Sequence, residues 1–303
     1  MRISRISLSL MLLLALAGCA GRGGQAPVFG PDTAKVRVAA SFYPVYEVVR
    51  AVGGDRVDLV NLVPAGTEPH DWEPTPRHLQ TLNQAVLFFY SGAGMEAWVD
   101  KTLKSLDNKA LTVVELSSGL PLITGDGGTD PHVWLDPQNL VLEAKAVRDA
   151  LSQVDPGGQA AYAANASAFV AKLSALDQEF RAGLAGCRRK DVFTSHAAFA
   201  YLTRRYGLQQ RAIMGLQPDA EPKPKDLSRI VAEARAQGVT YIFFETLVSD
   251  KVAKVVANEM GAGTLVLNPL EGLTEAEAKA GKDYFTIMRQ NLANLQTALE
   301  CDK

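Results

Sequence analysis

Cysteine and excess charge of either sign are scarce in this sequence. Three cysteines among 303 residues, none in a C-x-x-C pair, exclude a disulfide-rich scaffold and a zinc site built on thiolate pairs. The 31 basic side chains almost balance the 33 acidic ones, so no basic field exists for binding nucleic acid. No repeat with a period of 20 to 50 residues is found. With 47% apolar and 21% charged residues, the chain is typical of a folded protein long enough for two domains.

The only long apolar run lies at the N-terminus and has the features of a secretion signal. Positive charge precedes an apolar stretch at 7–17, which is shorter than the roughly 20 residues needed to span a bilayer. Residues 16–19, LAGC, look like a bacterial lipobox. We predict a signal peptide over 1–18, a lipid on Cys19 and a flexible tether over 19–35; the alternative is an ordinary signal peptide with an incidental cysteine. Either way the protein works outside the cytoplasm, on the outer face of the cytoplasmic membrane or in the periplasm.

Lipidation of Cys19 would leave Cys187 and Cys301 in a compartment that permits disulfides. We predict a disulfide between these two, which would tie the end of the last helix to the second half of the chain. Two unpaired buried thiols are the alternative.

Strand-like and helix-like stretches alternate along the chain, which predicts parallel sheets covered by helices. The expected strands are 36–41, 57–63, 85–90, 111–116, 191–195, 211–215, 241–245 and 264–267. The expected helices include 43–52, one from 76, 137–154, 197–206, 225–237, 251–259 and one from about 284.

The clearest break is the segment DPGG at 155–158, and a long helical stripe follows it. Larger apolar residues recur at helical spacing over 159–185, predicting a helix about 40 Å long. We therefore predict an α/β fold of two lobes with mostly parallel sheets, joined by one long rigid connecting helix. The N-terminal lobe would occupy 36–157, the linking helix 158–187 and the C-terminal lobe 188–303.

Three of the four histidines share a context that suggests ligands. His70, His132 and His196 each lie in or beside a loop shortly before a helix, about 60 residues apart, so only tertiary structure can unite them. A helix N-terminus disfavours imidazolium and so favours the neutral, metal-binding form. Any one such histidine is more often a simple hydrogen-bonding residue, but three in one context favour a shared site. His78 lies within a helix, where we predict packing or solvation.

A fourth ligand should come from the second lobe. Glu271 follows the last predicted strand, and Pro269 turns the chain out of that strand. Glu245, which ends the run YIFFE, is the competing candidate, although it would also serve to brace the loop. Three neutral imidazoles and one carboxylate suit tetrahedral Zn²⁺, whereas Mn²⁺ prefers more oxygen ligands and is the less favoured cation.

Five separated segments carry a family resemblance: PAGTEPHDWEPTP, DPHVWLDP, SHAAFAYLTRRYGL, QPDAEPKPKDL and TLVLNPLEGLTE. They closely resemble the zinc-specific branch of the metal-binding lipoproteins that serve ABC importers, the cluster A-I solute-binding proteins. The resemblance runs from about Val36 to the C-terminus. It implies two lobes joined by a long helix, with zinc held in the cleft by His70, His132, His196 and Glu271. Manganese members of this family carry Glu in place of the third His, so His196 favours zinc.

The resemblance also implies a function and partners. The protein would capture zinc and deliver it to a membrane permease driven by a cytoplasmic ATPase, and we expect a monomer that is not an enzyme. A zinc hydrolase is the alternative from another class, but no H-E-x-x-H or G-x-S-x-G motif is present. A manganese-binding member and an adhesin are further alternatives. Glu245 and Ser249 recur near the cleft in this branch, but we do not expect either to bind the metal.

One segment departs from the family pattern. Many zinc members insert a loop rich in His and Asp shortly before the second ligand histidine. Here residues 123–130 read ITGDGGTD and contain no histidine, so we do not expect a metal-gathering loop. The glycines of this segment would permit motion.

Overall fold

The structure, a computed structural model, describes residues 28–31, 34–125, 127–218 and 224–302. The predicted signal peptide, the lipidation site Cys19 and most of the predicted tether lie outside the described residues.

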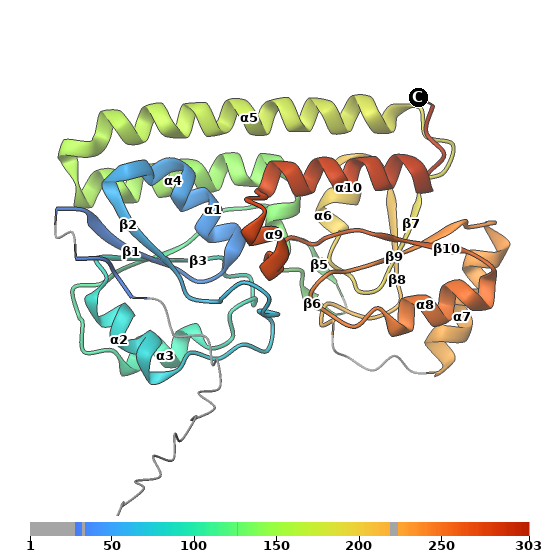
Figure 1. Cartoon of the computed structure of the whole chain (residues 1–303), viewed down its shortest axis with the longest axis horizontal. Coiled ribbons are helices and arrows are strands. Elements are labelled where there is room, and N and C mark those ends of the chain that lie inside the picture. The colour runs from blue at the N-terminus through green and yellow to red at the C-terminus, as the bar shows by residue number, and fades with distance from the viewer. Residues whose placement is uncertain (1–27, 32–33, 126, 219–223, 303) are drawn as a thin grey trace, which may run out of the picture.

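Two four-stranded parallel sheets form the centres of two lobes (Figure 1). The first has the order β2-β1-β3-β4, with β1 at Val36–Ala40, β2 at Val57–Asn61, β3 at Leu87–Tyr90 and β4 at Thr112–Glu115. The second has the order β10-β9-β7-β8, with β7 at Asp191–Thr194, β8 at Gln209–Ala212, β9 at Tyr241–Phe244 and β10 at Gly263–Val266. All these pairs are parallel, so the loops after the strands gather at one edge of each sheet.

Helices cover both faces of each sheet. The N-terminal lobe contains α1 (Tyr43–Gly53), α2 (Pro76–Gln84), α3 (Val99–Ser105) and α4 (Pro137–Val154). The C-terminal lobe contains α6 (Ala200–Arg205), α7 (Pro224–Ala236), α8 (Lys251–Met260), α9 (Glu275–Lys279) and α10 (Tyr284–Ala298). Proline opens α2 and α4, and the Asp136 side chain caps α4 by accepting a hydrogen bond from the Gln138 N–H.

The long helix α5, Gln159–Ala185, runs across both lobes (Figure 1). Its 27 residues at 1.5 Å per residue give a length of about 40 Å. It packs on α1 and α4 at one end and on α10 at the other, and its buried side chains belong to one apolar core shared by both lobes. The predicted fold class is confirmed. Among the described residues, no helix is both long and apolar enough to cross a membrane.

A disulfide joins Cys187, just after α5, to Cys301, just after α10. The link closes a loop across 114 residues of sequence and fixes the end of the chain beside the end of the long helix. Cross-linking so distant a pair restricts the unfolded chain and so stabilises the folded lobe.

Several predicted boundaries were wrong, and the largest shifts are those of α6 and β8. Helix α6 begins at Ala200 instead of Ala197, because the Ala197 N–H bonds to the Gly215 carbonyl and holds that segment as a loop. Strand β8 lies two or three residues earlier than predicted. Helices α3 and α9 were not predicted at all.

Within the segment 123–130 two short strands pair antiparallel, β5 (Thr124–Gly125) with β6 (Gly128–Thr129). The Tyr201 hydroxyl of the other lobe accepts from the Ile123 N–H and donates to the Asp130 carbonyl. The ends of this segment are therefore fixed across the lobe junction.

The buried carboxyl of Glu143 in α4 makes the folding stability depend on pH. Burial, with repulsion from buried Glu96, raises its pKa to about 8. Because the folded pKa lies above the unfolded one, the folded state binds the extra proton, and its stability falls as pH rises from about 4.5 through about 8. We expect Glu143→Gln to raise the free energy of unfolding by about 2 to 4 kcal/mol at pH 9 and by little at pH 5. Thermal melts across this range provide the measurement, with exposed Glu73→Gln as control; a gain independent of pH would contradict the expectation.

Candidate metal centre

His70 lies in the loop between β2 and α2. Its backbone N–H donates to the Glu68 carboxylate at 3.0 Å, and its side chain is almost fully buried. His78, the third residue of α2, has a different role, since its Nδ1 accepts the Thr75 N–H at 3.0 Å and its ring packs against Trp72. The structure thus gives His78 the packing role that its place in a helix predicted, together with capping of α2.

His132 is oriented by an aspartate two residues earlier. Oδ1 of Asp130 accepts the backbone N–H of His132 at 2.9 Å and lies 2.8 Å from its Nδ1. In the neutral ring this contact places the proton on Nδ1 and leaves the lone pair on Nε2. Asp130 was not identified from the sequence. Its position two residues before His132, in the segment D-P-H, could have indicated a carboxylate partner for that ring.

His196 has an equivalent partner in Glu245. Its Nδ1 lies 2.6 Å from Oε1 of Glu245, which also accepts a hydrogen bond from the Ser195 hydroxyl. Glu245 follows β9, the neighbour of β7, so the two ends meet at one sheet edge. The sequence left open whether Glu245 would be a ligand or a brace; in the structure it contacts Nδ1 of His196, whereas Nε2 of this ring faces Glu271. Ser249 is exposed and contacts none of the three histidines.

Glu271 completes the group from the loop after β10. Its Oε1 lies 3.3 Å from Nε2 of His70, 3.1 Å from Nε2 of His132 and 3.4 Å from Nε2 of His196. The Nε2 atoms of His132 and His196 are 3.3 Å apart. His132, His196 and Glu271 are each at most 1% exposed. Four residues from loops far apart in sequence thus bring one donor atom each to a single buried point.

These separations fit a tetrahedral metal ion. Ligand atoms about 2.0 to 2.1 Å from a zinc ion at tetrahedral angles lie about 3.3 to 3.4 Å from one another. The four donor atoms all lie within 4.8 Å of one another, and theirs is the only such convergence of His, Cys, Asp or Glu found in the part of the chain that the structure describes. Lone pairs that face one another at this distance repel unless a cation or a proton lies between them, so the donor set fits a divalent cation.

The pKa values of the histidines and of Glu271 show how protons compete with a metal ion for the four donor atoms. Burial disfavours the charged form of His196, but hydrogen bonds with Glu245 and Glu271 outweigh it and raise its pKa to about 10. Burial likewise opposes the charge on His132, whose contacts with Asp130 and Glu271 nevertheless raise its pKa. For Glu271 burial alone would raise the pKa, but the three imidazoles hold it well below its usual range. The carboxylate is therefore ionised, and a metal must displace the proton of His196.

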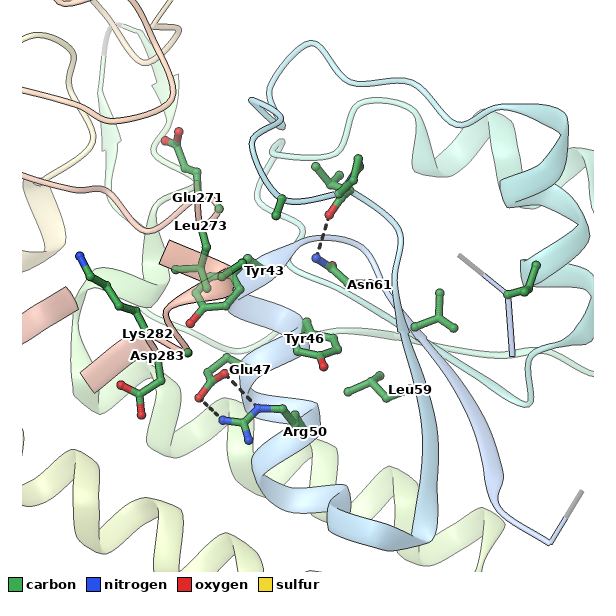
Figure 2. Close-up of a pocket in the computed structure, with 18 residues that line it drawn as sticks. Tyr43, Tyr46, Glu47, Arg50, Leu59, Asn61, Glu271, Leu273, Lys282 and Asp283 are labelled. Atoms are coloured by element: carbon green, nitrogen blue, oxygen red, sulfur yellow. Dashed lines mark hydrogen bonds and ion pairs between the residues drawn. The ribbon is translucent and has the colours of Figure 1, made fainter. Parts of the chain in front are cut away.

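A cavity of about 810 Å³ adjoins the Glu271 loop on the side of α1 and β2 (Figure 2). Tyr43, Tyr46 and the ion pair between Glu47 and Arg50 lie along it, whereas the Glu271 carboxylate points away from these residues. The cavity is therefore distinct from the point where the four donor atoms meet.

A protein family described as the periplasmic component A of a zinc-uptake complex matches residues 38–298 of the chain. The chain belongs to this family. The resemblance drawn from the five sequence segments is confirmed, and the zinc-uptake component A family is one of transport components that bind metal.

Members of the zinc-uptake component A family and their structures are similar to the chain over most of its length. The zinc-binding protein AdcA of Streptococcus pyogenes serotype M1 is 40% identical over 286 residues, which cover 86% of this chain and 56% of AdcA. The chain thus spans about half the length of AdcA. The high-affinity zinc uptake system protein ZnuA of Bacillus subtilis is 38% identical over 306 residues, 95% of this chain and 94% of ZnuA. The crystal structure of the Zn(II)-bound ZnuA-like domain of Streptococcus pneumoniae AdcA superposes with a TM-score of 0.79 at 38% identity, covering 88% of this chain and 99% of that domain.

Proposed function

We propose that this protein is the extracytoplasmic zinc-binding component of an ABC importer, and that Zn²⁺ is its cargo. The observation that carries the proposal is that Oε1 of Glu271 lies 3.1 to 3.4 Å from Nε2 of each of the three histidines, with all four donor atoms within 4.8 Å of one another. In this role His70, His132, His196 and Glu271 hold the ion, while Asp130 and Glu245 fix the ring tautomers. The zinc-binding relatives support the choice of metal.

Four protein ligands favour storage and delivery over catalysis. A zinc hydrolase keeps a coordination position open for water and needs a general base beside it. Here Glu271 contacts the three rings through Oε1, and one oxygen each of Asp130 and Glu245 holds a ring by its Nδ1. Four protein donors leave no open position in a tetrahedral coordination shell. We infer that the protein is not an enzyme.

The rest of the proposal concerns assembly. A lipid on Cys19 would anchor the protein outside the cytoplasm, and a membrane permease with a cytoplasmic ATPase would receive the zinc. We propose that the protein acts as a monomer, with an N-terminal lobe over 36–157, a linking helix over 158–187 and a C-terminal lobe over 188–303. One apolar core around α5 joins the two lobes and holds them rigidly together. Release of zinc would therefore depend on small motions of the loops at the cleft.

A competition titration tests the cargo. Zinc and manganese are added to the metal-stripped protein, and the bound metal is counted by mass spectrometry. We expect one tightly held zinc per chain that a hundredfold excess of manganese does not displace, because three imidazole nitrogens and one carboxylate favour zinc. Displacement by manganese, or the lack of a tight site, would refute the assignment.

A further inference from the structure

Two buried asparagines hold the loop that carries Glu271. Asn291 of α10 is 1% exposed, its Oδ1 accepts the backbone N–H of Asn268 at 2.9 Å, and its Nδ2 donates to the Asn268 carbonyl at 2.7 Å. The Asn268 side chain in turn accepts the N–H of Leu270 at 2.8 Å. One side chain on a helix thus fixes both backbone polar groups of Asn268, three residues before Glu271.

The residue just before Glu271 adopts an unusual conformation. Leu270 is fully buried and has a φ of 59°, in the left-handed region that residues with a Cβ seldom adopt. Such a conformation persists only where the surrounding structure imposes it. Besides the asparagines, Trp134 of the N-terminal lobe contributes, since its Nε1 donates to the Pro269 carbonyl at 2.7 Å. The direction in which Glu271 leaves the backbone is therefore set by its neighbours and not by its own preference.

We propose that Asn291 is a positioning residue for the metal site, acting on Glu271 through Asn268 and Leu270. The proposal rests on the proposed function, in which Glu271 binds zinc. Asn291 does not touch the four donor atoms, but its two hydrogen bonds are what ties the Asn268 backbone to α10. Without them the left-handed turn would relax, and the carboxylate would lose its place opposite the three rings.

A double-mutant cycle on zinc affinity tests this role. Asn291→Leu keeps the approximate size of the side chain and removes both hydrogen bonds. In the otherwise unchanged chain it should weaken zinc binding about 10- to 100-fold, as the loss of a partner behind a metal ligand commonly does. In a Glu271→Ala background the same change should alter the dissociation constant by less than about threefold, because the ligand that Asn291 positions is gone.

The absorption spectrum of bound Co²⁺ reports the ligands around the metal, so a general loss of folding stability does not change it. The Asn291→Leu spectrum should shift toward that of Glu271→Ala. Asn291→Asp keeps the hydrogen-bond acceptor but loses the donor. Its zinc affinity and its Co²⁺ spectrum should lie between those of the wild type and Asn291→Leu. The aspartate variant also replaces the leucine variant in the test if the latter fails to fold. Leu295→Ala, one turn along the buried face of α10, is the matched control and should lower the melting temperature without changing either readout.

The outcomes separate the two hypotheses. Wild-type affinity in Asn291→Leu and Asn291→Asp, or an equal loss in both backgrounds, would reduce Asn291 to a structural residue and overturn the inference. Failure of the wild-type protein itself to bind zinc would instead refute the proposed function.

Discussion

Replacing His196 by alanine should weaken zinc binding about 100- to 1,000-fold. A structural zinc site with four ligands contributes about 10 to 16 kcal/mol, so one ligand accounts for about 2.5 to 4 kcal/mol. His196 is fully buried at the meeting point of the four donor atoms, and no other histidine of the C-terminal lobe can replace it. Competition with a chelator of known affinity measures the loss.

His78→Ala is the matched control. This histidine is also buried, but its Nδ1 is engaged with Thr75, and it lies outside the group of donor atoms. The variant should lose some stability at the start of α2 and retain zinc affinity within about twofold, since only the helix cap is affected. Equal losses of affinity in the two variants would refute the assignment of His196 as a ligand.

Lowering the pH should also weaken zinc binding strongly. Before the metal binds, His196 has a pKa of about 10, so its ring carries a proton that zinc must displace, and the pKa of His132 is raised as well. Each displaced proton makes the affinity fall about tenfold per pH unit below the pKa of its ring. Between pH 8 and pH 6 we therefore expect a loss of about 100-fold or more. Calorimetry in two buffers of different ionisation enthalpy counts the protons released.

The stability of the metal-free protein should change with pH in the opposite direction and fall as the pH rises. Because the folded pKa of His196 lies above its ordinary value of 6.5, its stabilising contact with Glu245 and Glu271 is complete below about pH 6.5 and is lost as the pH rises through about 10. The increase in melting temperature that zinc produces should thus grow from pH 6 to pH 8. A constant increase over this range would mean that no proton is displaced and would contradict the pKa values.

Much of the fold followed from local signals in the sequence. The alternation of strands and helices, the break at 155–158 and the stripe over 159–185 predicted two α/β lobes and the long helix, because each depends on short-range periodicity and turn chemistry. The boundary of α6 was wrong because the contact that delays the helix comes from Gly215, outside the local segment.

The choice between Glu271 and Glu245 required the tertiary structure. The sequence shows only that each follows a strand of the second lobe. In the sheet β9 lies directly beside β7, which brings Glu245 to the Nδ1 side of His196, whereas β10 lies one strand further and its loop returns Glu271 to the Nε2 side. The two similar carboxylates thus contact different nitrogens of the same ring.

The sequence by itself determined the kinds of donor atom and the loops in which they lie, because residue types and strand ends are local properties. It also left Cys187 and Cys301 as the pair available for a disulfide. Only the tertiary structure decided which atoms meet, since the contacts of Glu271 with His70 and His132 span 201 and 139 residues of sequence. It alone identified the residues that orient the site, such as Asp130 and Asn291, because a hydrogen bond to a ring or a loop depends on packing that no local pattern encodes.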